Sequence, residues 1–132
     1  AEQQLERASL DFTTWALDYV SKLANLCTQA LEASEDGGRS KLFGDINLLA
    51  LELRGQGGTF GYPLISTFGK MLYDCTQEGC NEDDHAVEIV KAHIDAMRAV
   101  LREKVSGDGG EVGRALLASL KEAIKTKETL VK

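Results

Sequence analysis

The sequence predicts an all-α fold: an antiparallel four-helix bundle with a short N-terminal lead-in and an additional C-terminal helix. Apolar residues recur at steps of three and four over most of the 132 residues, which is the spacing of one face of an amphipathic helix. The chain contains a single proline, so long segments are free to be helical. We find no sustained alternation of apolar and polar residues that would indicate a strand.

The first long helix is predicted over residues 9–34, where ten apolar residues from Phe12 to Leu31 follow helical spacing. Ser9 or Asp11 is expected to cap it, because a short oxygen acceptor satisfies the first free N–H groups of a helix. Residues 1–8 are expected to form a short helical lead-in through Leu5. The polar, glycine-rich residues 35–38 predict a turn after this helix.

The second helix is predicted from residue 40 to residue 57 or 58, with Ser40 as its cap. Its core face carries Leu42, Ile46, Leu49 and Leu53. At about 100° per residue, the opposite face combines leucines with small residues: Gly44, Asn47, Leu48, Leu51, Arg54, Gly55 and Gly58.

Glycines at the end of this helix allow two interpretations. A glycine inside a helix costs about 1 kcal/mol relative to alanine, so the helix could end near Arg54 and the glycines could form a loop. Alternatively, the helix continues and the glycines allow another group to approach closely.

Three further helices are predicted. Pro63 suits the first turn of a helix, and apolar residues continue at helical steps until a loop at residues 76–81. Acidic residues 82–84 favour a helix N-terminus, and the apolar stripe that follows extends to about residue 105. A turn over residues 106–110 precedes the last helix, which carries apolar residues from Val112 to Ile124, and residues 126–132 are expected to be a frayed tail.

Length, composition and charge favour one domain over residues 1–132 of an ordinary soluble type. The formal net charge of −6 opposes binding to nucleic acid and to anionic membranes. No apolar run has the length of a membrane span or the context of a signal peptide. We therefore expect a cytoplasmic protein, with a monomer favoured.

No constellation typical of a catalytic or metal site is found. The three cysteines form no Cys-x-x-Cys pair, and neither histidine stands at a ligand spacing from them. Cys27 and Cys75 are expected in the core and Cys80 in a loop; His85 is expected to be solvated and His93 to be a satisfied residue at the bundle edge. We expect no metal, no cofactor and no enzymatic activity.

The run from Ala50 to Gly61 resembles the signature of histidine-containing phosphotransfer (HPt) domains: His, any residue, an aliphatic, Lys or Arg, Gly, and glycines three and six positions further on. The match comprises Leu53, Arg54, Gly55, Gly58 and Gly61, with Leu64 and Gly69 also where such domains often carry an aliphatic and a glycine. The resemblance implies a four-helix bundle with the signature on its second helix, and it is especially close to a bacterial branch of the family.

One departure changes what the resemblance implies. Leu51 stands where the family carries the phosphorylated histidine, and leucine has no nitrogen to accept a phosphoryl group. The resemblance therefore implies a two-component signalling module that binds a receiver domain or a histidine kinase without carrying phosphate. The expected contact residues are Leu48, Leu51, Arg54, Gly55, Gln56 and Gly58.

Two alternatives remain open at this stage. Leu51 could be a substitution in a working phosphotransfer protein, or the chain could be a helical interaction or dimerisation domain unrelated to a phosphorelay.

Overall fold

Five α-helices make up the described part of the chain, and no strand occurs in it. The computed structural model describes residues 2–33, 38–103 and 110–131, and it describes side chains for residues 12–33, 38–103 and 110–125. The helices are α1 (Glu2–Glu32), α2 (Arg39–Gly57), α3 (Pro63–Cys75), α4 (Asp84–Arg102) and α5 (Gly110–Val131). The predicted all-α class is therefore confirmed for these residues.

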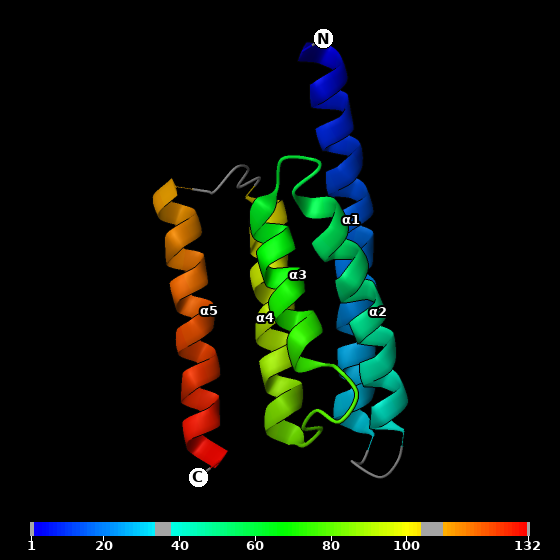
Figure 1. Cartoon of the computed structure of the whole chain (residues 1–132), viewed down its shortest axis with the longest axis vertical. Helices are drawn as coiled ribbons and strands as arrows, with labels where there is room; N and C mark the ends of the chain where they lie inside the picture. The colour runs from blue at the N-terminus through cyan, green and yellow to red at the C-terminus, as the bar shows by residue number, and fades with distance from the viewer. Residues whose placement is uncertain (1, 34–37, 104–109, 132) are drawn as a thin grey trace.

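Successive helices run in alternating directions with their long axes nearly aligned (Figure 1). Helix α1 packs against α2 and α4, and α3 also packs against α2 and α4, so that these four helices enclose one core. Helix α5 packs against the outer side of α4 (Figure 1). The first turns of α1 project past the ends of the other helices.

Several helix ends differ from the predicted ones. Helix α1 is continuous from Glu2, so caps at Ser9 or Asp11 and a separate lead-in are wrong; residues 2–32 contain no Gly or Pro to interrupt the helix. Helix α4 ends at Arg102 instead of near residue 105. Helix α5 continues to Val131, so the predicted tail is helical in its backbone. The turns predicted at 35–38 and 106–110 lie largely outside the described residues.

The start of α2 also corrects a prediction. Gly38 precedes the helix with φ of 101°, a conformation that glycine adopts without strain, and no side chain caps the helix there. Ser40 is therefore inside the helix and not its cap. At α4 the expected acidic start is confirmed, because the Asp83 side chain accepts a hydrogen bond of 2.8 Å from the Ala86 N–H.

The core consists of apolar side chains from all five helices, with Phe43, Phe68 and Leu23 among its largest buried members. On α2, Ile46 and Leu53 are buried as predicted, whereas Leu42 and Leu49 are only partly buried. Phe43 and Ala50 are buried in place of Leu42 and Leu49, so the buried stripe of α2 is rotated from the predicted one. It comprises Arg39, Phe43, Ile46, Ala50, Leu53 and Gly57.

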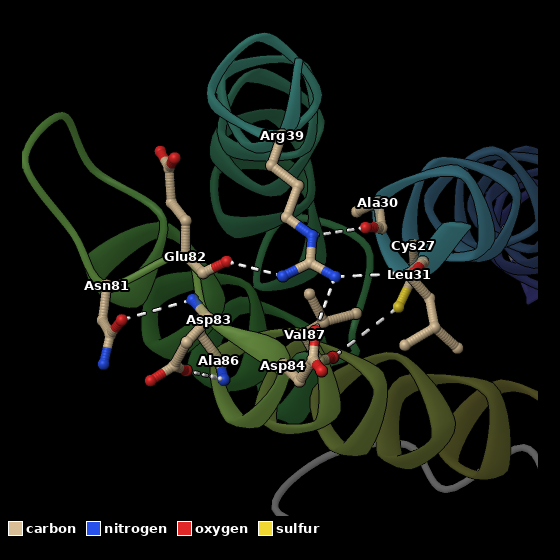
Figure 2. Close-up of polar contacts among 10 residues, drawn as sticks. All are labelled: Cys27, Ala30, Leu31, Arg39, Asn81, Glu82, Asp83, Asp84, Ala86 and Val87. Carbon is tan, nitrogen blue, oxygen red and sulfur yellow. Dashed lines mark hydrogen bonds and ion pairs between the residues drawn. The ribbon is translucent and has the colours of Figure 1, made fainter. Parts of the chain in front are cut away.

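A buried arginine ties the ends of three helices together (Figure 2). Arg39 is only 2% exposed. Its guanidinium donates to the carbonyl oxygens of Ala30 and Leu31 at the end of α1, to the Glu82 carbonyl at 2.9 Å, and to Asp84 Oδ1 at 2.7 Å at the start of α4. These carbonyls at the end of α1 have no partner within their own helix. Arg39 therefore satisfies them while its own charge is neutralised by Asp84.

Two glycines allow α2 and α3 to approach backbone to backbone. A Cβ atom added to Gly69 would lie 2.8 Å from the Arg54 nitrogen and 3.1 Å from the Ala50 oxygen. A Cβ added to Gly57 would lie 2.6 Å from the Ser66 nitrogen and 2.8 Å from the Tyr62 oxygen. The close approach that the glycines suggested is thus present at Gly57, and α3 supplies its own glycine for a second contact.

We expect Gly69→Ala to lower the free energy of unfolding by about 1–3 kcal/mol, because its methyl group would press on the α2 backbone, which cannot move aside freely. The matched control is Gly55→Ala, since a Cβ at Gly55 meets nothing within 4 Å. Replacing this helical glycine should raise stability by about 0.5–1 kcal/mol. Urea denaturation of the two variants measures both; equal effects would contradict the proposed contact.

Candidate functional site

The candidate site is the solvent-facing side of α2 in its second half. Leu48 is 62% exposed and Leu51 is 43% exposed, the two largest exposed fractions among the large apolar side chains of α2. Both occupy the helix face opposite Ile46, Ala50 and Leu53, which are fully buried. Packing of that buried stripe therefore presents the two leucines to solvent.

Small residues clear the surface around Leu51. No atom would lie within 4 Å of a Cβ added to Gly55 or to Gly44, and a Cβ at Gly58 would meet only the Ser66 hydroxyl, at 3.6 Å. Gly55 and Gly58 are thus not required by packing of the described residues, in contrast to Gly57. Because neither residue has a side chain, the helix backbone is uncovered at these positions and another molecule could contact it.

Arg54 supplies the positive charge of this face. Its side chain is exposed, and its guanidinium carbon lies 5.7 Å from the centre of the Tyr73 ring on α3. A guanidinium over an aromatic face is attracted by the ring quadrupole. No carboxylate among the described side chains forms an ion pair with Arg54, so its charge is available to a ligand.

The backbone beneath Arg54 is held by a serine of α3. The Ser66 hydroxyl donates to the Arg54 carbonyl at 2.7 Å and accepts from the Gly58 N–H at 2.8 Å. Nearer the middle of α2, the Asn47 amide donates to two groups at the end of α3: the Tyr73 carbonyl at 2.9 Å and the Thr76 hydroxyl at 3.2 Å. These bonds fix the last turns of α2 against α3.

On its other side the site meets α1. The Tyr19 hydroxyl donates to Glu52, the residue after Leu51, and this hydrogen bond is the main reason that the pKa of Tyr19 is raised. The Tyr19 ring packs against the Trp15 ring, with ring centres 4.3 Å apart, and the Trp15 ring packs in turn against Phe12. Phe12 stacks on Phe60 of the α2–α3 connection. Glu52 is therefore directed away from Leu51 and toward α1.

The structure places all six predicted contact residues on α2 or directly after it. Leu48, Leu51, Arg54, Gly55, Gln56 and Gly58 are all exposed. Sequence reasoning missed three residues that support them: Tyr73, Ser66 and Asn47 in its hydrogen-bonding role. The spacing of Gly69 and Tyr73, one turn apart on α3, is the signal that could have indicated Tyr73, because the two share the face that touches α2.

Chemically, the site offers apolar contact, one cation and free space. Leu51 has no heteroatom, and its chain neighbours provide no nucleophile paired with a base. In the part of the chain that the structure describes, no three His, Cys, Asp or Glu residues are arranged to hold a metal ion. None of the described helices has the length and apolar run needed to cross a membrane.

A cavity lies between α3, α4 and α5, away from the solvent-facing side of α2. Its volume is about 510 Å³, and its lining includes Met71, Cys75, Cys80, His85, Ile89 and His93. His85 lines this cavity and is half-buried, so it is less exposed than predicted. His93 is 1% exposed and its Nδ1 lies 2.8 Å from the Ile89 carbonyl oxygen, so the prediction of a satisfied histidine is confirmed.

Comparison with models of protein families, with curated proteins and with solved structures finds no match to this chain.

His93 makes stability depend on pH. Burial lowers its pKa below the ordinary value of 6.5. The unfolded chain therefore binds a proton near pH 6.5 that the folded chain binds only at lower pH, and stability falls as pH decreases through that window. We expect His93→Gln to flatten the decrease of unfolding free energy between about pH 7 and pH 5.

His85→Gln is the matched control, because it removes the other histidine from the same cavity. Urea denaturation at a series of pH values measures the slopes. A His93→Gln slope as steep as that of His85→Gln would contradict the assignment to His93.

Proposed function

We propose that this chain is an HPt-like signalling module that binds a receiver domain or a histidine kinase and does not carry phosphate at Leu51. The observation that carries the proposal is the solvent-facing side of α2, where the signature-like run of residues presents Leu51 among open glycines beside Arg54. The proposed contact surface consists of Leu48, Leu51, Arg54, Gly55, Gln56 and Gly58.

The arrangement of the helices supports this proposal. Helices α1 to α4 pack in a ring with alternating directions, which is compatible with the antiparallel four-helix bundle of HPt domains. The signature-like residues lie on the second of these helices, as the resemblance implies. In this interpretation α5 is an addition on the outer side of α4.

Binding without phosphate chemistry follows from the side chains present. Neither histidine substitutes for the missing one, because His85 and His93 lie on α4 and line the cavity beside α3 and α5. What remains at the surface is suited to recognition. Burying an exposed leucine against a partner contributes about 1–2 kcal/mol, and the contact with Tyr73 reduces the freedom that Arg54 would lose on binding.

The net charge of the chain is negative, so an acidic partner would be attracted only by a local positive charge. The whole chain carries a formal charge of −6, which would repel a partner that presents carboxylates. Arg54 is exposed and forms no ion pair with a carboxylate among the described side chains, so it supplies a positive charge at the proposed surface. In the family, the base at this position can attract phosphate or the receiver's acidic pocket, and the second of these roles is the one we propose for Arg54.

We expect Arg54→Glu to weaken binding of a receiver domain from the same organism by tenfold or more, because it places a carboxylate opposite an acidic pocket. The matched control is Lys41→Glu, which makes the same change of charge on α2 about 20 Å away. Isothermal titration calorimetry measures both. Equal weakening by the two variants would indicate a general charge effect and would contradict the proposed surface.

Self-association is the second candidate, favoured by the exposure of both Leu48 and Leu51. Sedimentation equilibrium of the unmodified chain distinguishes the candidates. A dimer that Leu51→Ser dissociates would favour self-association, whereas a monomer at high concentration would favour a surface for another protein.

Restoring the missing nitrogen tests whether the surface is of the phosphotransfer type. We expect Leu51→His to accept a phosphoryl group from a phosphorylated receiver, since position 51 is exposed and its surroundings are open. Phosphate-affinity gel electrophoresis detects the phosphorylated protein, and loss of the shifted band after acid treatment identifies phosphohistidine. The control Leu48→His, one turn earlier on the same face, should stay unmodified. A folded Leu51→His variant that stays inert with receivers that bind it would contradict the HPt-type interpretation.

A further inference from the structure

Two cysteines that the proposed surface does not use share one cavity. Cys75 is the last residue of α3, and Cys80 lies in the connection to α4. Both are free and half-buried, and both line the cavity beside α5. We propose that Cys75 and Cys80 form a dithiol site that closes to an intrachain disulfide under oxidising conditions and binds trivalent arsenicals when reduced.

The backbone between the two cysteines makes them neighbours. Thr76 caps the end of helix α3, and its N–H donates to the Tyr73 carbonyl. The chain then reverses in a turn in which the Cys80 N–H donates to the Gln77 carbonyl at 3.0 Å, and Gly79 adopts φ of 86°. This reversal directs Cys80 back to the cavity that the end of α3 already lines.

The two sides of the pair differ in their contacts with the rest of the fold. The Thr76 hydroxyl donates to the Leu72 carbonyl at 2.7 Å and accepts from Asn47, so the end of α3 is held in place. Residues 77–79 are exposed. Closing a disulfide would therefore draw Cys80 toward Cys75 without displacing α3.

Neither thiol is built as a reactive nucleophile. Burial, followed by the proximity of Cys80, raises the pKa of Cys75 to about 12, and burial also raises the pKa of Cys80. That Cys80 acts electrostatically on Cys75 agrees with their shared position. Both thiols are therefore protonated at neutral pH, so they do not suit a catalytic cysteine and would exchange with a disulfide only slowly.

Oxidised glutathione is the oxidant in the proposed reaction. The Cys80 thiol loses a proton and attacks one sulfur of glutathione disulfide, releasing one glutathione and leaving a mixed disulfide. The Cys75 thiol then loses its proton and attacks the Cys80 sulfur, releasing the second glutathione. Two electrons and two protons pass from the protein to glutathione, and one S–S bond is exchanged for another.

The third cysteine is an internal control. Cys27 is buried in α1, its Sγ lies 3.7 Å from the Val87 carbonyl oxygen, and it is not among the residues that line the cavity. Burial raises its pKa to about 11. A reaction of the proposed pair should leave this thiol unchanged.

Phenylarsine oxide tests the pair without an oxidant, because its arsenic forms two As–S bonds and its oxygen leaves as water with the two thiol protons. We expect wild type and Cys27→Ala each to bind one phenylarsenic group, detected by intact mass. Cys75→Ser and Cys80→Ser should each lose it.

Treatment of the wild-type chain with oxidised glutathione, followed by peptide mapping, gives a readout that needs no variant. We expect one disulfide-linked peptide pair containing Cys75 and Cys80, with Cys27 still alkylated by iodoacetamide. Three free thiols after treatment, a disulfide that includes Cys27, or only disulfides between chains would overturn the proposal.

Discussion

The contact of the α2 and α3 backbones is the constraint on which the rest of the structure depends. Gly69 and Gly57 each lack the Cβ that would collide with the facing helix, so the two backbones touch where side chains would otherwise separate them. This contact determines which side of α2 faces inward. Once Ala50 and Leu53 are buried against α3 and the core, Leu51 has no orientation left except toward solvent. The geometry of the proposed surface is thus a consequence of packing on the opposite side of the same helix.

Polar contacts keep this helix in place at both ends. At its start, Arg39 is buried and joins the end of α1 to the start of α4. At its end, Ser66 of α3 holds the Arg54 carbonyl and the Gly58 N–H. A buried guanidinium is costly to desolvate, and here it is stable because carbonyls that lack helical partners surround it. A surface on a helix held in this way would bind with little loss of conformational freedom.

The sequence was sufficient to predict the helices, but not their exact ends or the polar contacts that join them. Apolar periodicity reports burial averaged over several turns, which is why all five helices were predicted. A helix end depends on one or two residues, and Gly38 at positive φ could not be distinguished from an ordinary turn residue. Nor does the sequence reveal which glycines are in contact: Gly55 and Gly57 look alike, yet only Gly57 meets another helix. The burial of Arg39 depends on three segments distant in the chain.

The two kinds of glycine also bear on the proposed function. Gly57 and Gly69 are explained by packing alone, so they carry no information about a partner. Gly55 and Gly58 are not explained in this way, because a methyl group on Gly55 would meet nothing and would favour the helix. A glycine that forgoes this stabilisation while facing solvent beside Leu51 and Arg54 is compatible with the proposed partner, which would approach the backbone there. In the proposed HPt-like function, Leu51 would stand in place of the acceptor histidine and would keep a side chain of comparable bulk at the centre of the contact surface. If the proposed function is correct, recognition and phosphoryl transfer are separable on one helix face: the glycines and Arg54 would serve recognition, and only the side chain at position 51 would decide the chemistry.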